Sequence, residues 1–451
     1  MTMSRRKFLA LSATAATLPV VPGLAGCGGQ EHSAGIGYWS AFANQEQRDY
    51  FRRARVDAFP GPGRVELTVK PTASIDQLTQ TALAAGTGPD LVQTDGPAQV
   101  AAYAAAGYLL PLEDYARTYH WDRVLAPWAL AASRINGQLL ALPADYETMI
   151  MIYNPATLHA HGWPVPRDRA TFEAICTEAK ARGLLPVAAG NADWRAASEW
   201  WVTMALNHYA GPEAVYQALR GRLPWTDPVF VDAITTLSRY YRSGWWGGSV
   251  EDYFTNSFPR MYTALAEGKA AFMITGSWAS TEIAPYFGQA AGNSATWDWA
   301  PLFPLRAGVP DVVWDLGIGR TLSINAHTDK ADETAAYLDF LESDPRRQAD
   351  GVAEVGMQPA PVQLAAADFP PGADAGQVRL YTELSNAATI GYTTWTFFPQ
   401  QTDTELYTNF DKVFTGQLSP ADYLAGLDKT FRAELRRGAV PTAPAPNGVA
   451  S

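Results

Sequence analysis

The chain has little cysteine and no long apolar run. Only Cys27 and Cys176 occur in 451 residues, which is too few for a disulfide framework. The longest apolar stretch runs from Phe8 to Val21 and is broken by Pro19. It is shorter than the roughly 20 residues that a membrane-spanning helix needs. The sequence therefore predicts a body without a transmembrane helix.

Motifs of metal, phosphate and nucleophile chemistry are also missing. The sequence has no GxxxxGK[ST] loop, no HExxH, no paired CxxC and no GxSxG elbow. His159 and His161 lie two apart without a third ligand nearby, so a solvated loop pair is favoured over a metal site. We expect no catalytic centre, no metal and no cofactor.

Basic residues are fewer than acidic ones, 34 against 45, and the formal net charge is −11. An acidic body argues against nucleic acid as a partner and against broad adhesion to anionic lipid. The chain is 47% hydrophobic and 18% charged, which are globular values, and its length predicts more than one domain.

The N-terminal segment has the order of an export signal. Arg5, Arg6 and Lys7 precede the apolar stretch, and small residues precede Cys27. "SRRKFLA" resembles a twin-arginine signal, and "LAGC" resembles a bacterial lipobox, whose cysteine is acylated. We expect residues 1–26 to be removed and lipid on Cys27 to anchor the protein at the extracytoplasmic face of the membrane. An ordinary signal peptide with an incidental cysteine is the alternative.

Cys176 has a different environment. In "TFEAICTEAKARG" it shares one helical face with Phe172, Ile175 and Ala179, which predicts a buried small hydrophobe. With Cys27 lipidated, we expect no disulfide within the chain.

Strand and helix patterns alternate along the body. The segments "IGYWSA", "VELTVKP", "DLVQTD" and "AAFMITG" are typical of buried strands, and "EQRDYFRRARVDAF" and "SIDQLTQTALAAG" of helices. This alternation predicts an α/β fold with mainly parallel sheets. Ser74 with Gln77 predicts a capping box, and Asp227 and Ser419 predict N-caps before a proline.

Aromatic residues stand in unusual places. The chain has 15 Trp and 20 Tyr, and Trp39, Trp194, Trp278, Trp314 and Trp395 lie beside small or polar residues where a strand gives way to a helix. In an open α/β sheet such positions lie at the carboxyl ends of strands, where ligands bind. Indole faces suit the apolar side of a sugar ring. Packing is still the commoner role of any single Trp, and we assign "EWWV" and "GWWGG" mostly to packing.

A family resemblance rests on many segments in order, from about Tyr38 to Arg436. They include "AAGTGPDLVQTD", "AAAGYLLPLEDY", "INGQLLALPADYETMIMIYNPATL", "ALAEGKAAFMITGSWAS" and "LGIGRTLSINAHTDKADETAAYLDFLESDPRRQ". Together they resemble the extracellular solute-binding proteins of ABC importers, in the large sugar-binding family that includes the maltose-binding protein. "GTGPD" is also explained locally, because Gly86 suits a left-handed helix cap and Pro89 fixes the next turn.

The resemblance implies a two-lobed periplasmic-binding-protein fold with a ligand cleft and a hinge that the chain crosses three times. The crossings are expected near residues 144–148, 314–318 and 357–362. The expected parts are a signal peptide at 1–26, a tether at 27–35, lobe 1 at 36–145 and 317–358, lobe 2 at 146–316 and 359–437, and a flexible tail at 438–451.

The resemblance also implies a function. The chain is expected to be a monomeric receptor, not an enzyme, that captures a carbohydrate of the oligosaccharide class and delivers it to the permease subunits of an ABC transporter. The residues expected to bind ligand are Trp39, Gln45, Asp95, Asp145, Glu147, Trp194, Trp278, Trp314 and Trp395.

Two alternatives stay open. A secreted glycoside hydrolase would need two carboxyl groups roughly 5–10 Å apart. Asp145 and Glu147 alternate along an extended segment, which we expect to point them to opposite faces. The same fold could instead bind a polyamine, a glycerophosphodiester or a peptide, because an acidic cleft with Trp walls also suits cations.

Overall fold

The computed structural model describes residues 35–71 and 74–447. The predicted signal peptide, Cys27 and nearly all of the tether lie outside the described residues, as do the last four residues of the tail.

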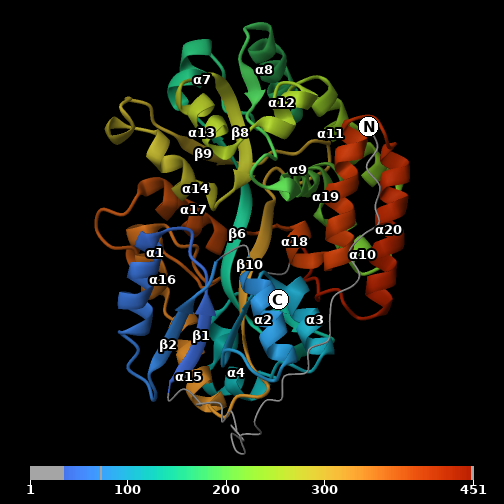
Figure 1. The fold of residues 1–451 in the computed structure, drawn as a ribbon. Coiled ribbons are helices and arrows are strands. Elements are labelled where there is room, and N and C mark those ends of the chain that lie inside the picture. Colours follow the sequence, from blue (N-terminus) through green and yellow to red (C-terminus); the bar gives the residue numbers. More distant parts are fainter. Residues whose placement is uncertain (1–34, 72–73, 448–451) are drawn as a thin grey trace, which may run out of the picture. The chain divides into compact units, whose positions relative to one another are not determined.

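A nine-stranded mixed sheet runs through the described part of the chain (Figure 1). Its main path has the order β2-β1-β3-β10-β6-β8-β7, with β11 paired to β10 and β9 paired to β6. The strands are β1 (Ile36–Ser40), β2 (Val65–Val69), β3 (Leu91–Thr94), β6 (Leu142–Tyr153), β7 (Leu185–Val187), β8 (Ala270–Gly276), β9 (Asp298–Pro301), β10 (Trp314–Ile324) and β11 (Ile390–Tyr392). A separate hairpin joins β4 (Arg134–Ile135) and β5 (Gln138–Leu139).

The expectation of mainly parallel sheets is wrong. Strands β1, β2 and β3 pair in parallel, as do β7 with β8 and β10 with β11. The long strands β6 and β10 instead pair antiparallel with each other, and they also run antiparallel to β3, β8 and β9. Mixed pairing follows because these two strands carry the chain between the lobes in opposite directions.

The two long strands form the connection between two α/β lobes. The first half of β6 pairs with β10, and its second half pairs with β8 and β9. The register between β6 and β10 shifts between Gly317 and Thr321, which marks a bulge. The third connection lies beside β6, where the Tyr146 N–H donates to the Pro359 carbonyl. Three adjacent connections thus agree with the expected hinge, whereas the exact lobe limits stay a prediction.

Helices surround each end of the sheet (Figure 1). Around β1, β2 and β3 lie α1 (Gln45–Phe51), α2 (Ile75–Ala84), α3 (Pro97–Ala105), α4 (Glu113–Tyr119), α15 (Ala331–Glu342) and α16 (Pro345–Val355). Around β7, β8 and β9 lie α7 (Pro155–His161), α8 (Arg169–Ala181), α9 (Ser198–Ala205), α11 (Pro228–Arg242), α12 (Val250–Thr255), α13 (Phe258–Ala266) and α14 (Ala279–Ile283). Shorter or connecting helices are α5 (Trp121–Val124), α6 (Pro127–Ala132), α10 (Pro212–Leu219), α17 (Ala375–Ser385) and α18 (Thr394–Phe397).

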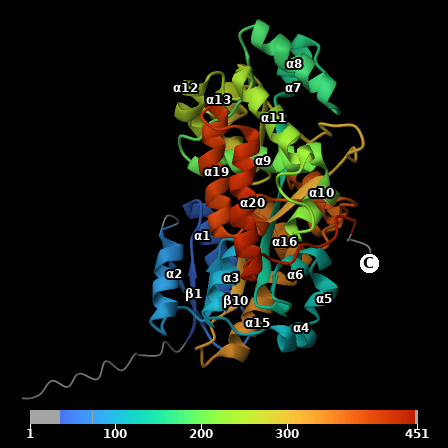
Figure 2. The ribbon, with the colours of Figure 1, turned by 90° about the vertical axis from the view of Figure 1, so that its right-hand side faces the viewer.

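Two C-terminal helices, α19 (Gln400–Phe414) and α20 (Pro420–Arg436), run side by side (Figure 2). They pack against α9 and α11 of the second lobe. Trp225 lies at this junction and contacts Phe398 and Phe431 edge to face. Such aromatic packing fixes the segment between α18, which carries Trp395, and α19.

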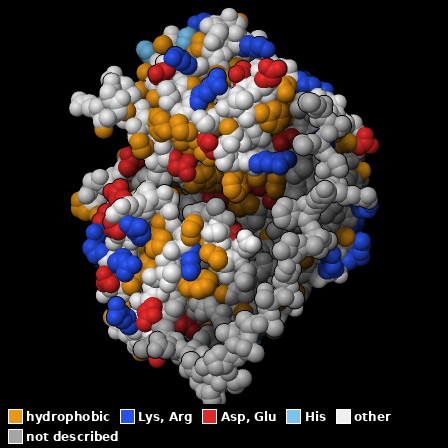
Figure 3. Space-filling model, viewed as in Figure 1, with side chains coloured by type: hydrophobic (Ala, Val, Ile, Leu, Met, Phe, Trp, Pro, Cys, Tyr) orange, Lys and Arg blue, Asp and Glu red, His pale blue; other side chains and the backbone are white. Residues whose placement is uncertain are grey.

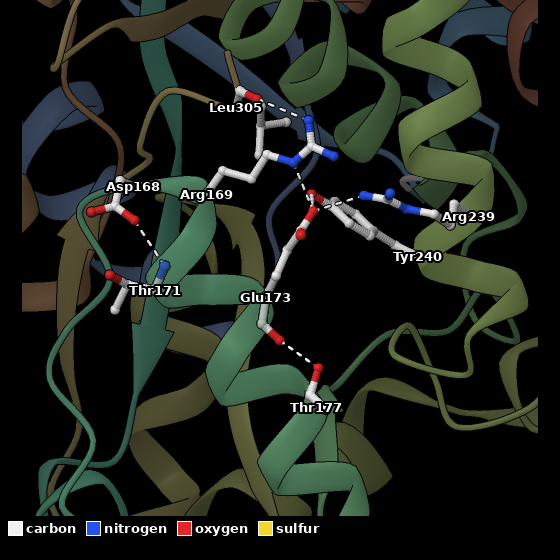
Figure 4. A network of polar contacts seen from close by, with 8 residues as sticks. All are labelled: Asp168, Arg169, Thr171, Glu173, Thr177, Arg239, Tyr240 and Leu305. Carbon is white, nitrogen blue, oxygen red and sulfur yellow. Dashed lines mark hydrogen bonds and ion pairs between the residues drawn. The ribbon is translucent and has the colours of Figure 1, made fainter. Parts of the chain in front are cut away.

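A polar network braces α8 against α11 (Figure 4). The Glu173 carboxylate accepts hydrogen bonds from Arg169, Arg239 and Tyr240, each at 2.7 Å. Arg169 also donates to the Leu305 carbonyl. Burial opposes ionisation of Glu173, but the hydrogen bonds from Arg169 and Tyr240 outweigh it and lower its pKa. The carboxylate therefore stays charged at neutral pH.

The predicted strands and helices are confirmed, and so are two of the three predicted caps. The expected burial of all four strands is wrong for β2, which is an edge strand with mostly exposed residues. The Asp227 and Ser419 side chains accept from the backbone N–H groups of Val229 and Asp422. The capping box at Ser74 is wrong: its hydroxyl donates to the Pro71 carbonyl and makes no cap hydrogen bond.

Cys176 is confirmed as a buried residue on the same face of α8 as Phe172. The flexible tail predicted at residues 438–451 is described as far as residue 447. The Pro446 carbonyl accepts from the Ile390 N–H, and the Pro444 carbonyl accepts from the Tyr392 hydroxyl. These bonds hold the segment against β11.

Candidate functional site

A cavity of about 420 Å³ lies where the hinge strands meet the second lobe. Figure 3 shows a hollow at this level of the molecule, with apolar and acidic side chains along it. The lining combines aromatic rings with carboxyl groups and one guanidinium: Asp95, Asp145, Glu147, Asp193, Trp194, Glu199, Trp200, Phe258, Trp278, Glu282, Gly319, Arg320, Gln358 and Trp395.

Four aromatic rings follow one another along one wall. Phe258 stacks on Trp200 with ring centroids 6.0 Å apart. Trp200 meets Trp278 edge to face at 5.3 Å, and Trp278 meets Trp395 edge to face at 5.8 Å. Edge-to-face contacts fix the orientation of each indole. The wall therefore offers rigid apolar faces to a ligand.

Gly276 makes room for the central indole. It is the last residue of β8, and a Cβ atom at this position would lie 1.8 Å from the Trp278 ring. The next residue, Ser277, is tied to β6 because its N–H donates to the Thr148 carbonyl and its hydroxyl accepts from the Thr148 N–H. The glycine and these bonds together set where Trp278 projects.

Two carboxyl groups of β6 form the floor of the cavity. The prediction that Asp145 and Glu147 point to opposite faces is wrong, because residues two apart in a strand share a face. Both lie against Gly319, whose absent Cβ would be 2.7 Å from Asp145 Oδ1 and 3.1 Å from Glu147 Oε2. Tyr146, between them, points to the other face and packs against Trp128.

The floor is held by ion pairing and hydrogen bonds. Arg320 Nε donates to Asp145 Oδ2, and Gln358 Nε2 donates to Glu147 Oε2 at 2.6 Å. Asp145 Oδ1 is buried and has no hydrogen-bond partner among the described residues. An unpaired buried acceptor is costly, so this oxygen is available to a donor from a ligand.

Burial changes the protonation of Glu147. Burial, and then the nearby charge of Asp145, raise its pKa to about 8, although the hydrogen bond from Gln358 acts in the opposite direction. The Trp395 ring N–H lowers this pKa slightly, but its geometry falls short of a hydrogen bond. Burial alone would lower the pKa of Arg320, and Asp145 outweighs that effect and raises it. At neutral pH the floor thus holds one charged pair beside a largely protonated carboxyl.

A second acidic pair lies at the other end of the cavity. Burial, followed by the neighbouring Asp403, raises the pKa of Glu199 well above its usual range. Burial also raises the pKa of Asp403, to about 7, while its hydrogen bond with Glu199 lowers it. Glu199 is therefore the protonated member of this pair. The rim beside it is formed by Trp194, whose side chain is 52% exposed.

The structure brings six of the nine predicted residues together and leaves three outside. Trp39 lies on β1 under Lys70, whose ammonium is 4.1 Å from the ring centroid, and does not line the cavity. Gln45 begins α1 and lines a different surface hollow. Trp314 is 5% exposed and packs against Trp299. These three predictions are not supported by the geometry.

The sequence did not predict several residues that line the cavity. Trp200 was assigned to packing as part of "EWWV", and it is buried, but one side lines the cavity. Its neighbour Trp201 is a core residue whose ring N–H donates to the Ile274 carbonyl. Arg320 and Gln358 sit on the second and third connections between the lobes, so their proximity to Asp145 could be inferred only from the hinge topology.

Within the described residues, no group of three or more His, Cys, Asp or Glu side chains has the arrangement of a metal site. The helices of the same part of the chain include none with the length and apolar character of a membrane span.

The fold is shared with solved sugar-receptor structures. A structure titled "Chitin oligosaccharide binding protein" matches with a TM-score of 0.72 and 20% identity, covering 89% of this chain and 99% of that one. The sugar-binding protein MalE of Xanthomonas citri matches with a TM-score of 0.70 and 18% identity over 89% of this chain and 97% of that one. At these identities the likeness concerns the fold.

The sequence relatives are also named as binding proteins. A probable sugar-binding periplasmic protein of Mesorhizobium japonicum is 25% identical over 203 residues, which cover 45% of this chain and 47% of the relative. A similar protein of Brucella suis is 26% identical over 44% of this chain and 46% of its own length. The chain thus matches about half the length of these relatives. An uncharacterised ABC transporter extracellular-binding protein of Pyrococcus horikoshii is 20% identical, over 68% of this chain and 67% of its own.

The family profile of bacterial extracellular solute-binding proteins matches residues 43–347, more than half of the chain. With the fold described above, this match identifies the chain as a member of the bacterial extracellular solute-binding protein family.

Proposed function

We propose that the protein is a receptor that captures a saccharide in the cavity between its lobes and delivers it to the permease of an ABC importer. The observation that carries the proposal is the wall of Trp200, Trp278 and Trp395 facing the carboxyl floor. Sugar rings present an apolar face that stacks on indole and hydroxyl groups that need both donors and acceptors.

The protonation of the floor supports this assignment. A protonated Glu147 donates to a hydroxyl oxygen, while Asp145, which pairs with Arg320, accepts from a hydroxyl group through its unpartnered Oδ1. The cavity therefore supplies both halves of hydroxyl recognition. Asp145 and Glu147 share one face of β6, as the two carboxyl groups of a glycoside hydrolase would have to. Their placement is explained without a hydrolytic reaction, because each carboxyl group has a hydrogen-bond partner or an acceptor site for a ligand.

The predicted export and anchoring complete the proposal. A twin-arginine-like signal followed by lipid on Cys27 would hold the receptor at the outer face of the cytoplasmic membrane, close to its permease. Replacement of Cys27 with serine should move the exported protein from the membrane fraction to the soluble fraction. Retention of C27S in the membrane fraction would contradict lipid anchoring while leaving the binding proposal intact.

A cationic solute is the second candidate. The cavity lining contains six carboxyl groups and one guanidinium, and Trp walls bind cations through their faces. A polyamine would hold Glu147 ionised, so its affinity should rise between about pH 6 and pH 9, in contrast to a neutral sugar that uses the protonated form.

The deciding experiment is a thermal-shift and calorimetric screen of the chain from Gly28 onward against saccharides, polyamines and glycerophosphodiesters. A ligand at 100 times its Kd stabilises the folded state by about 2.7 kcal/mol. We expect a saccharide to raise Tm and the W278A variant to abolish the rise. A matched control is W163A, since Trp163 packs on His161 and lies outside the cavity. A shift produced by polyamines and by no saccharide would replace the sugar assignment with the cationic one.

A further inference from the structure

A small cavity of about 30 Å³ lies in the first lobe, where β1, β3 and β10 meet α15 and α16. We call it the arginine cavity, because two arginines line it, Arg55 and Arg320. The other polar side chains of its lining are one carboxyl group, Glu342, the phenol of Tyr38 and three glutamine amides. The arginines thus outnumber the carboxyl groups in this lining.

The size of the arginine cavity limits what it can hold. A single water molecule needs roughly 10–15 Å³, so a volume of about 30 Å³ admits one or two atoms of that size. A sugar ring, a phosphate and a sulfate each have more heavy atoms than that. The cavity therefore admits water or a monatomic ion.

Arg55 reaches the cavity from a π-helical turn, Arg52–Val56, which continues α1. The Asp57 N–H donates to the Arg52 carbonyl five residues earlier. Such a turn is wider than an α-helical one and shifts the following side chains around the helix axis. Arg52 and Arg53 are exposed, whereas Arg55 is only 4% exposed. The turn therefore directs one of its three arginines inward.

The helix α16 leaves room for the Arg55 guanidinium. A Cβ atom at Gly351 would lie 3.2 Å from Arg55 Nη2 and 3.5 Å from the Tyr50 hydroxyl. A glycine inside a helix costs about 1 kcal/mol relative to alanine, and here it gives the guanidinium its space. The π-helical turn and this glycine, which are far apart in the sequence, thus serve the same buried cation.

The charge of Arg55 is poorly compensated. Its Nη2 donates to the Arg347 carbonyl at 2.5 Å, but its Nη1 is buried and has no hydrogen-bond partner in the part of the chain that the structure describes. Burial lowers the pKa of Arg55. A buried charge without a counter-charge is costly, so the site favours an anion beside Nη1.

The groups around Arg55 do not repel an anion. Burial raises the pKa of Glu342 to about 8, although the charges of Arg55 and Arg320 act in the opposite direction. The Glu342 carboxyl is therefore largely protonated at neutral pH. The Gln93 side chain accepts from two hydroxyl groups through Oε1, which leaves its NH₂ group to donate to another acceptor.

We propose that the arginine cavity binds one monatomic anion, chloride under ordinary conditions, held by the Arg55 guanidinium and the Gln93 amide. Water fits the volume but leaves the charge of Arg55 without a counter-charge. The site is distinct from the ligand cavity, and the proposal holds whatever solute the cleft binds. Arg320 lines the arginine cavity and pairs with Asp145, so a bound anion stabilises the first lobe beside the cleft floor.

Bromide, which scatters anomalously, tests the site directly. Crystals of the chain from Gly28 onward are grown without chloride and soaked in sodium bromide, and diffraction data are collected at the bromine absorption edge. We expect an anomalous peak in the arginine cavity, within hydrogen-bond distance of Arg55 Nη1. Ordered water in the cavity without an anomalous peak would overturn the proposal.

Thermal unfolding tests the site in solution. At constant ionic strength, stepwise replacement of sodium gluconate by sodium chloride should raise Tm in a saturable manner, by about 1 °C or more. Gluconate has too many atoms for the cavity. R55M removes the guanidinium and should abolish this rise. Q93L removes only the amide donor and should increase the half-saturating chloride concentration several-fold, which guards against a folding defect in R55M.

The matched control is R52Q, because Arg52 belongs to the same turn but is exposed. It removes the same charge from the protein and should keep the rise of Tm with chloride. Loss of the rise in R52Q as well as in R55M would overturn the proposal, since net charge would then explain it.

Two further outcomes would overturn the proposal and leave the proposed function intact. A bromide peak without any dependence of Tm on chloride would mean an adventitious ion only, bound at the concentration of the crystal soak. A dependence on chloride that R55M retains would be a general effect of the salt on the protein.

Discussion

Replacement of Glu147 with glutamine should change how the stability of the empty protein depends on pH. The folded-state pKa of Glu147 is raised from 4.5 to about 8, first by burial and then by Asp145. Between these values the unfolded chain has lost the proton and the folded chain keeps it. The unfolded state therefore binds fewer protons, and the free energy of unfolding falls as pH rises from about 4.5 to about 8.

The size of the effect follows from the shift. Each pKa unit corresponds to about 1.4 kcal/mol, so a shift of this size costs the folded wild-type protein up to about 5 kcal/mol above pH 8. Glutamine has the shape of the protonated carboxyl and can still accept the hydrogen bond from Gln358. E147Q should therefore resemble wild type near pH 5 and exceed its stability by several kcal/mol near pH 9.

Urea unfolding, followed by Trp fluorescence and far-UV circular dichroism at several pH values, measures this difference. The control is E251Q, because Glu251 is exposed in the first turn of α12. A difference between E147Q and wild type that stays constant from about pH 5 to about pH 9 would refute the assigned protonation of the cleft floor.

Three smaller changes test the elements that hold the site. G276A places a Cβ within 1.8 Å of the Trp278 ring, and overpacking of this kind costs about 1–3 kcal/mol of stability. Because the ring must move, saccharide affinity should fall. An unchanged affinity would show that Trp278 does not belong to the site. E173Q removes the negative charge of the oxygen that accepts from two arginines and a tyrosine, on a side chain 29% exposed. Unfolding should become easier by about 1 kcal/mol, and by less in high salt. Equal stability of E173Q and wild type at all salt concentrations would contradict the ionic brace. D227A removes the cap on the Val229 N–H and should cost about 1 kcal/mol, which D227N should largely restore.

The regular elements were predictable because their signals are local. Apolar runs bounded by turns mark β3 and β8, and an acceptor side chain followed by proline marks the start of α11 and α20. Ser74 carried another local signal, a capping box with Gln77, and this prediction failed because the Ser74 hydroxyl donates to a carbonyl three residues earlier. A capping motif indicates which hydrogen bond the side chain can make, but it does not determine which hydrogen bond forms.

The described part of the tail shows the limit of composition as evidence. A flexible tail is predicted at residues 438–451, and segments rich in proline and alanine bury little apolar surface. Yet Pro444 and Pro446 still present carbonyl acceptors, and the edge strand β11 and the Tyr392 hydroxyl supply donors. The contacts of the segment depend on hydrogen-bond donors of a neighbouring element, and the sequence of the segment does not show where these donors lie.

Among the tryptophans predicted for the cleft, the sequence located those after strands better than those within strands. Trp278 and Trp395 line the cavity and follow strand ends. Trp39 and Trp314 lie within β1 and β10, so their direction depends on which sheet face meets the cleft. Strand periodicity alone places Asp145 and Glu147 on the same face of β6, and the prediction of opposite faces applied this periodicity wrongly.

The cleft draws its carboxyl floor and its aromatic wall from different parts of the fold, and this division links binding to closure. Asp145 and Glu147 lie on the hinge strand β6, and Arg320 lies in the bulge on β10. The rings of Trp200 and Trp278 belong to the second lobe. A ligand that stacks on the rings and bonds to the floor spans the connection between them. Such a ligand favours whichever hinge angle lets it make both sets of contacts, because it can shift the equilibrium only by its difference in affinity for the two forms.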